Sequence, residues 1–235
     1  MTIKTSTVPY EHAGDSLNGF LAWDDAAGEP RPLVLVSHAW GGQTDQEREI
    51  AKYIAGLGYT AFALDLFGRT GKDRDENRAL MTPFLEDRAK LQSRMTASLE
   101  VARAQAPAAH AAAAIGFCFG GLCVLDLARI GTDLRGVVSF HGLFHKPDVG
   151  KAETIPAKVL ILHGWDDPMA PPESVLSITE EMTAAKADWR LHAFGHTMHA
   201  FTNPAANDPD FGTVYNERAA NLSWKAMEDF LTEIL

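Results

Sequence analysis

One six-residue segment of the chain has the residue types and spacing for covalent chemistry: Gly116-Phe117-Cys118-Phe119-Gly120-Gly121. It matches a nucleophile elbow, a sharp strand-to-helix turn that holds its central side chain in a strained backbone conformation. Glycines are needed two residues before and after the centre, because a Cβ there would collide with the neighbouring strand or helix. The central residue is cysteine, so the segment predicts attack by a thiolate. The alternative is a small buried hydrophobe in a glycine-rich turn.

A thiol nucleophile needs a general base and an acid that orients the base. Residues 163–171 follow an apolar run and contain Asp166 and Asp167, whereas residues 194–201 follow a later run and contain His196 and His199. The order of nucleophile, acid and histidine is the one found in hydrolases built around an elbow. These segments therefore favour a catalytic role for Cys118, and they leave the choice within each pair open.

The rest of the pattern alternates short apolar runs with helical segments, after an antiparallel start. This alternation predicts an α/β fold with a doubly wound, mostly parallel sheet flanked by helices, in one domain over residues 1–235. The stretch between Phe140 and Lys158 contains two prolines and leaves little room for a helical lid, so we expect an open pocket and no lid domain. The strands are expected at 8–10, 19–23, 33–37, 60–66, 111–115, 136–140, 158–162 and 189–193, and the helices at 45–57, 76–104 (interrupted at Pro83), 122–129, 174–185 and 217–234.

Over nearly its whole length the chain resembles the dienelactone hydrolase family of α/β-hydrolases. The resemblance rests on the Gly-x-Cys-x-Gly-Gly elbow, on a Gly-x-x-Asp-x-x-x-Pro turn over residues 164–171, and on a closing His-x-Phe over residues 199–201. It implies that Cys118 is the nucleophile, Asp167 the acid and His199 the base. Asp166 is then interpreted as a solvated turn residue, and His196 as a structural neighbour.

An oxyanion hole should use the backbone N–H of the residue after the nucleophile, Phe119, and an N–H from the turn over residues 38–42. For the second donor the resemblance points to Ala39. Trp40 is either an apolar pocket wall or packed core. His38 stands where dienelactone-cleaving members carry a glutamate that touches the thiol, so we assign it to the substrate pocket. Because a histidine cannot repel a thiolate as a carboxylate does, we expect a standing thiolate in the resting enzyme.

Those members also carry an arginine shortly after the catalytic histidine, which holds a substrate carboxylate. Here residues 202–204 are Thr, Asn and Pro. We therefore expect carboxylate-bearing lactones to be poorer substrates than neutral esters or lactones, since an unpaired carboxylate in a partly desolvated pocket is costly. Another arginine could replace the missing one, and the candidates are those at 69, 74, 78, 88 and 94.

Bulk properties narrow the possible partners. A net charge of −10 argues against nucleic acid. No apolar run approaches membrane-spanning length, and residues 1–6 lack the apolar segment of a signal peptide, so we expect a cytoplasmic protein without a membrane partner. Cys118 and Cys123 would be separated by about 7.5 Å along one helix, so we expect free thiols. A zinc site at His192, His196 and His199 is not expected, because they lack an acidic partner at ligand spacing, and no other metal or organic cofactor is implied.

These inferences predict a cysteine-dependent hydrolase that cleaves a small lactone or carboxylic ester through a thioester acyl-enzyme. A general carboxylesterase without preference for dienelactones is one variant of this prediction. Two other hypotheses remain: a hydrolase-like protein that binds a ligand without turnover, and a redox-sensing thiol at the elbow.

Overall fold

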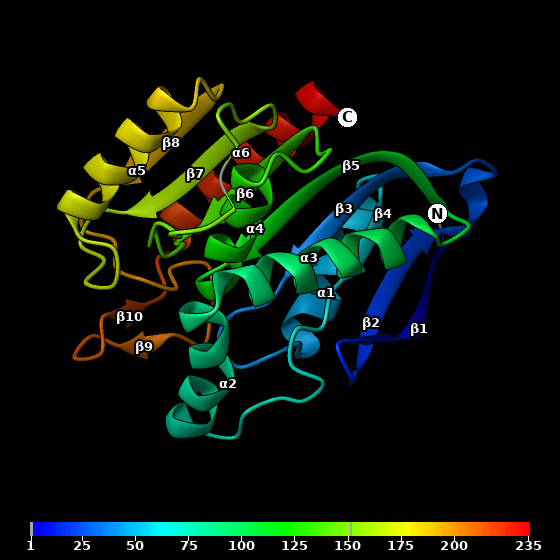
Figure 1. Cartoon of the computed structure of the whole chain (residues 1–235), viewed down its shortest axis with the longest axis horizontal. Helices are drawn as coiled ribbons and strands as arrows, with labels where there is room; N and C mark the ends of the chain where they lie inside the picture. Colours follow the sequence, from blue (N-terminus) through cyan, green and yellow to red (C-terminus); the bar gives the residue numbers. More distant parts are fainter. Residues whose placement is uncertain (1, 151) are drawn as a thin grey trace.

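The computed structural model describes residues 2–150 and 152–235, and its centre is a twisted sheet (Figure 1). In this part of the chain eight strands pair in the order β1-β2-β4-β3-β5-β6-β7-β8. The first two form an antiparallel hairpin, β2 pairs with β4 antiparallel, and all later neighbours are parallel. The strands are β1 Ile3–His12, β2 Asp15–Asp24, β3 Arg31–Ser37, β4 Thr60–Ala63, β5 Ala108–Phe117, β6 Gly136–Phe140, β7 Lys158–Gly164 and β8 Trp189–Phe194, with a separate two-stranded hairpin of β9 Asn207–Asp208 and β10 Thr213–Val214.

Helices cover both faces of the sheet (Figure 1). One apolar core joins the sheet to α3, α4 and α5, and a second joins the opposite face to α1 and α6. The predicted doubly wound α/β class is therefore confirmed. The predicted domain extent of 1–235 includes Met1 and Lys151, which lie outside the described residues. The helices are α1 Asp45–Gly56, α2 Arg74–Glu86, α3 Arg88–Arg103, α4 Phe119–Arg129, α5 Pro172–Ala184 and α6 Glu217–Ile234, with a short 3-10 turn over Asp25–Ala27.

Strand β3 explains why a continuous apolar run forms a strand here. Leu33 and Leu35 belong to the core under α3 and α4, whereas Val34 and Val36 belong to the core under α1 and α6. Successive side chains of a strand point to opposite faces, so both faces of a covered sheet require apolar residues. This strand carries the turn over residues 38–42 to the carboxyl edge of the sheet.

Several boundaries differ from the sequence-based expectation. Strands β1, β2 and β5 extend beyond their predicted ranges at both ends, and α4 begins three residues early. Strand β4 ends at Ala63, three residues before the predicted end at Leu66. The helix expected over 76–104 is interrupted at Asp87 rather than at Pro83, which lies inside α2. Asp87 leaves the helical region, with φ −116° and ψ 88°, and its side chain accepts a hydrogen bond from the Lys90 N–H. A short acidic side chain that can cap a new helix therefore determines the break.

A buried charge network ties the helices to the loop after β6. The Asp126 carboxylate of α4 accepts hydrogen bonds from Arg88 Nε at 2.9 Å and from Arg129 Nη1 at 3.1 Å. Arg129 also pairs with Glu181 of α5. Arg88 Nη1 donates to the carbonyl of His145 at 3.0 Å. Both arginines and Asp126 are buried, so each charge depends on its partners.

Replacing Asp126 with asparagine is expected to lower the free energy of unfolding by about 3–5 kcal/mol, because two buried guanidinium groups lose their shared counter-charge. Urea denaturation at neutral pH measures the loss. Asp133→Asn is the matched control, since Asp133 pairs with Arg103 and His110 at an exposed site and should cost less than about 1 kcal/mol. Equal losses for the two variants would contradict the network's role.

Candidate active site

Cys118 stands between β5 and α4 in the strained conformation that an elbow requires, with φ 54°. A Cβ on Gly116 would lie 2.1 Å from the Gly120 carbonyl oxygen, and one on Gly120 would lie 2.3 Å from the Ser37 carbonyl oxygen. Glycine is therefore sterically required at both positions. The second contact brings the start of α4 against the turn that follows β3.

Asp167 and His199 meet at the carboxyl edge of the sheet, Asp167 from the turn after β7 and His199 from the segment after β8. His199 Nδ1 donates to Asp167 Oδ2 at 2.7 Å, and both side chains are buried. The second oxygen of Asp167 accepts from the Met169 N–H at 2.8 Å. The carboxylate is thus held from both sides, and it fixes the ring so that Nε2 is the free nitrogen.

The proton affinity of His199 is unusually high. Burial lowers the pKa of His199, but the charge of Cys118 and the hydrogen bond to Asp167 outweigh burial and raise the pKa to about 10. Nε2 is buried, and among the described residues it has no well-aligned hydrogen-bond partner. A buried imidazole next to a thiol and a carboxylate can take a proton from the thiol and keep it.

Asp166 and His196, the alternative acid and histidine, do not belong to the group formed by Cys118, Asp167 and His199. His196 is fully exposed, its Nδ1 lies 3.8 Å from an Asp166 carboxylate oxygen, and the Asp166 side chain is 46% exposed. His192 is also exposed. Within residues 2–150 and 152–235 no three His, Cys, Asp or Glu side chains are arranged to hold a metal ion.

Two backbone N–H groups border the elbow. The N–H groups of Ala39 and Phe119 have no backbone acceptor in the described part of the chain. Phe119 is the first residue of α4, where helix geometry leaves N–H groups free. A site between two free N–H groups can stabilise a developing negative charge.

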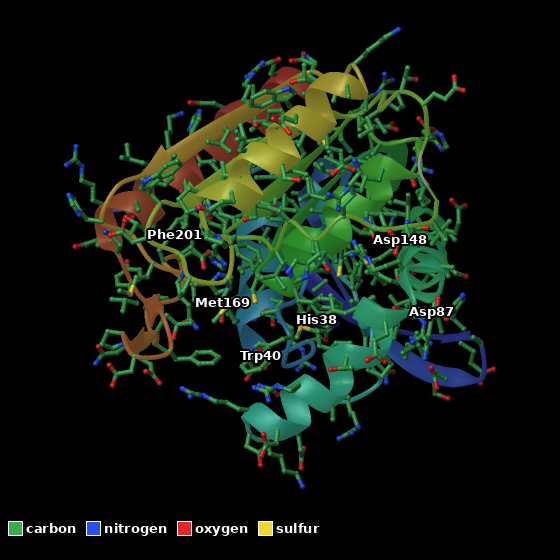
Figure 2. All side chains as sticks on the ribbon, turned by 60° about the vertical axis from the view of Figure 1, so that its left-hand side comes forward. His38, Trp40, Asp87, Asp148, Met169 and Phe201 are labelled. Carbon is green, nitrogen blue, oxygen red and sulfur yellow. The ribbon has the colours of Figure 1, made fainter. Side chains whose placement is uncertain are left out.

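A cavity of about 450 Å³ opens above Cys118. Its wall includes Trp40, whose ring stacks on Phe211 at a centroid distance of 5.9 Å. Figure 2 shows Trp40 and Met169 between α2 and the β9–β10 hairpin. The cavity is lined by Ala39, Trp40, Gln46, Glu47, Arg78, Met81, Leu85, Phe117, Cys118, His141, Leu143, His145, Met169, His199, Ala200, Asn203, Phe211 and Thr213.

The assignment of His38 to the substrate pocket is wrong. Its side chain is fully buried and is absent from the cavity wall. Nε2 accepts from the Leu66 N–H at 3.1 Å, so Nδ1 carries the proton and donates to the Ala39 carbonyl at 2.6 Å. Burial lowers the pKa of His38 and keeps it neutral. His38 therefore stabilises the turn after β3, and the thiolate expectation loses its support from this residue.

The cysteines are both free, as expected. Cys123 lies inside α4 and is fully buried, and burial raises the pKa of its thiol well above the usual range. A neutral, inaccessible thiol is inert. Cys118 is only partly buried and lines the cavity.

Sequence reasoning missed several cavity residues. His141 follows β6 directly, and its position at the carboxyl end of a parallel strand could have identified it. Glu47 comes from α1 and Phe211 from the β9–β10 hairpin. No local pattern connects these two residues to the elbow.

Arg78 is the one candidate arginine that lines the cavity. Among the described residues it has no ion-pair partner, and it is exposed to solvent. The other four candidates, Arg69, Arg74, Arg88 and Arg94, pair respectively with Glu76, Asp208, Asp126 and Asp15.

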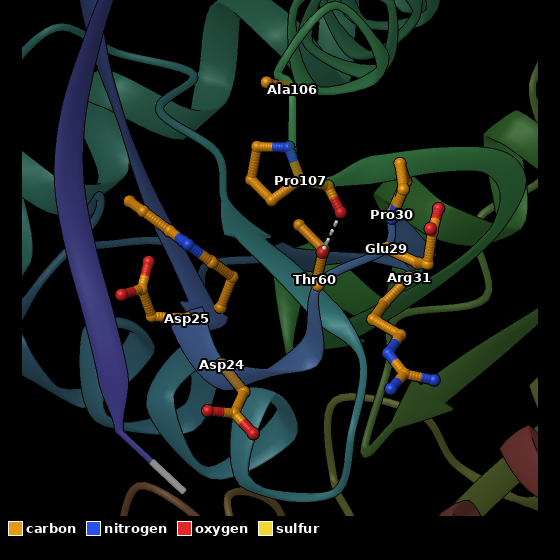
Figure 3. A pocket seen from close by; sticks show the side chains of 10 residues that line it. Asp24, Asp25, Glu29, Pro30, Arg31, Thr60, Ala106 and Pro107 are labelled. Atoms are coloured by element: carbon orange, nitrogen blue, oxygen red, sulfur yellow. Dashed lines mark hydrogen bonds between the residues drawn. The ribbon is translucent and has the colours of Figure 1, made fainter.

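A second hollow, of about 200 Å³, lies at the amino ends of β3 and β4 (Figure 3). Asp24, Asp25 and Arg31 border it, and Thr60 Oγ1 donates to the Pro107 carbonyl at 2.6 Å. Its wall contains no cysteine, serine or histidine. Ligands of open parallel sheets bind at the carboxyl ends of the strands, so the Cys118 cavity is the candidate site.

None of the described helices is both long enough and apolar enough to span a membrane.

Comparison with known proteins agrees with the fold. The model of the dienelactone hydrolase family matches residues 17–235. The solved structure named m3DLH is 34% identical with a TM-score of 0.94, and the alignment covers 99% of each chain. A dienelactone hydrolase-like promiscuous phosphotriesterase from metagenomic libraries is 33% identical with a TM-score of 0.93, covering 99% of this chain and 98% of that one. A carboxymethylenebutenolidase homolog of Homo sapiens is 24% identical over 182 residues, 76% of this chain and 73% of that one.

Proposed function

Because the chain belongs to the dienelactone hydrolase family, we propose that it hydrolyses small lactones or carboxylic esters through a thioester formed on Cys118. The observation that carries this proposal is the buried Asp167–His199 hydrogen bond beside a strained cysteine in a cavity. A nucleophile, a base and an acid that orients the base are the parts that acyl transfer requires.

In the proposed reaction His199 Nε2 takes the thiol proton, and Cys118 Sγ attacks the acyl carbon. The carbonyl oxygen becomes an oxyanion, which the Ala39 and Phe119 N–H groups stabilise. The C–O bond to the leaving group then breaks, and His199 returns the proton to that oxygen. Water attacks the thioester with His199 again as base, which releases the acid and restores the thiol. Asp167 keeps the imidazolium oriented throughout.

Acyl-enzyme trapping tests this proposal. The protein is mixed with a p-nitrophenyl ester of a short acid and quenched in acid, and intact-mass and peptide spectra locate the acyl group. We expect one acyl group on Cys118 and turnover of the ester. Turnover without acylation of Cys118 would contradict the thioester. Peroxide-sensitive Cys118 without any turnover would instead favour the redox hypothesis.

Substrate charge gives a second prediction. Wild-type protein is expected to cleave a neutral methyl ester of a lactone acid with higher kcat/KM than the free carboxylate form, because no arginine follows His199. Arg78 can compensate only in part, since an exposed ion pair contributes up to about 1 kcal/mol. Arg78→Gln should therefore lower kcat/KM for the carboxylate form by about fivefold at most and leave the neutral form unchanged.

Arg69→Gln is the matched control, because Arg69 is exposed, pairs with Glu76 and does not line the cavity. A wild-type preference for the carboxylate form would contradict the prediction. An equal change in kcat/KM for both forms in Arg78→Gln would show that Arg78 does not bind the substrate carboxylate.

A further inference from the structure

His141 connects the backbone of the nucleophile to the ring of the base. Its Nδ1 lies 3.2 Å from the Cys118 backbone nitrogen, and its Nε2 lies 2.7 Å from Thr202 Oγ1. Its ring meets the His199 ring edge-on, at a centroid distance of 5.1 Å and an angle of 64°. The reaction proposed above does not use this buried imidazole.

The hydrogen bonds define the tautomer of His141. A backbone N–H can only donate, so Nδ1 accepts from Cys118 and carries no proton. The proton is on Nε2, which donates to the hydroxyl of Thr202. Burial, together with the nearby charge of His199, lowers the pKa of His141 well below its usual range. The ring is therefore neutral and has a fixed orientation.

We propose that His141 is a positioning residue, whose neutral ring holds the Cys118 amide and the His199 imidazole in their reactive arrangement; this inference rests on the proposed function. Two strained residues share the hydrogen bond, because φ is 54° at Cys118 and 37° at His141. Such strain persists only where the surroundings fix it. The Cys118 N–H also donates to the Phe140 carbonyl at 3.1 Å, so the elbow amide is held by β6 and by the residue that follows β6.

Neutrality matters because His199 becomes positively charged when it takes the thiol proton. A second positive ring at 5.1 Å would oppose that charge. A protonated Nδ1 would also direct an N–H at the Cys118 N–H. The Cys118 N–H selects the tautomer with the proton on Nε2, and the Thr202 hydroxyl stabilises that tautomer by accepting from Nε2–H, so Thr202 acts through His141.

Two substitutions separate the contacts of His141. Asparagine has a carbonyl oxygen near the position of Nδ1 and can accept from Cys118, and it tolerates positive φ. Glutamine has an amide nitrogen near the position of Nε2 and can donate to Thr202, but it has no acceptor for the Cys118 amide. We expect His141→Asn to retain kcat within about fivefold, and His141→Gln to lose about 10- to 100-fold in kcat with KM nearly unchanged, because small misplacements of reacting groups have effects of this size.

Thr202 gives a second pair that leaves His141 intact. Thr202→Ser keeps the hydroxyl and should keep kcat, whereas Thr202→Val removes it at constant shape and should lower kcat about 10-fold. The melting temperatures of the His141 and Thr202 variants distinguish a loss of positioning from a loss of stability. Equal kcat for His141→Asn and His141→Gln, or kcat losses that only follow the melting temperature, would overturn the proposal.

A readout without turnover separates this proposal from the proposed function. Nitrogen-15 NMR of the imidazole rings in wild-type protein should report His141 as neutral with Nδ1 unprotonated at neutral pH. A charged ring, or a proton on Nδ1, would overturn the proposal even in an active enzyme. The expected tautomer in a protein that cleaves no ester would reject the proposed function and leave the structural assignment of His141 standing.

Discussion

Replacing Cys118 with alanine is expected to remove ester hydrolysis, with a loss in kcat on the order of 10⁴-fold or more, because no intermediate can form without the thiol. The fold should survive, since Cys118 is only partly buried and its replacement by alanine removes a single side-chain atom. Hydrolysis of a p-nitrophenyl ester measures the loss, and thermal unfolding checks the fold.

Cys123→Ala is the matched control. Both cysteines belong to the same strand–helix unit, but Cys123 is fully buried and its pKa is raised by burial, so its removal should leave turnover close to wild type. Retention of more than about a tenth of the activity by Cys118→Ala would reject the nucleophile, because triad nucleophiles carry far more than a tenfold effect.

The elbow was predictable from sequence because its constraint is local. Gly116 and Gly120 are required by contacts that a Cβ would make within the turn and with the adjoining strand. The alanine-rich segment before it has helix propensity, but a strand must enter an elbow, and residues 108–117 indeed form β5. Motif context therefore outweighed propensity in this segment.

His38 shows where a resemblance stops being informative. Its position in the turn after β3 was inferred correctly, but its side-chain direction was not. That direction depends on the free Leu66 N–H beyond β4, which the imidazole satisfies. A buried backbone donor needs an acceptor, and sequence does not reveal which side chain supplies it.

The cavity wall was the least predictable part of the site. Arg78 and Phe211 reach the cavity from α2 and from the β9–β10 hairpin, and Arg74 links these elements by pairing with Asp208 and lying 4.1 Å from the Phe211 ring centroid. The Arg74 contacts join two elements that lie more than a hundred residues apart in the sequence. Contacts of that kind are tertiary and have no local sequence pattern.

Asp167→Asn is expected to lower kcat on the order of 10⁴-fold, whereas Asp166→Asn should change it by less than about twofold. Asp167 accepts the His199 Nδ1–H at 2.7 Å. An asparagine can instead donate to Nδ1, which moves the ring proton to Nε2, the nitrogen that must accept the thiol proton. The substitution also removes one contribution that raises the pKa of His199 to about 10, so the imidazolium becomes less stable.

The two aspartates form a matched pair, because they are adjacent in one turn and differ in burial. Asp167 is buried, whereas the Asp166 side chain is about half exposed and has a carboxylate oxygen 3.8 Å from Nδ1 of the exposed His196. Steady-state kinetics of both variants at equal folded fraction decide the assignment. A large loss in Asp166→Asn with near-normal Asp167→Asn would show that the neighbouring carboxylate orients the base. Near-normal activity in both would show that His199 needs no acidic partner, since the buried hydrogen bond would then not be limiting for proton transfer.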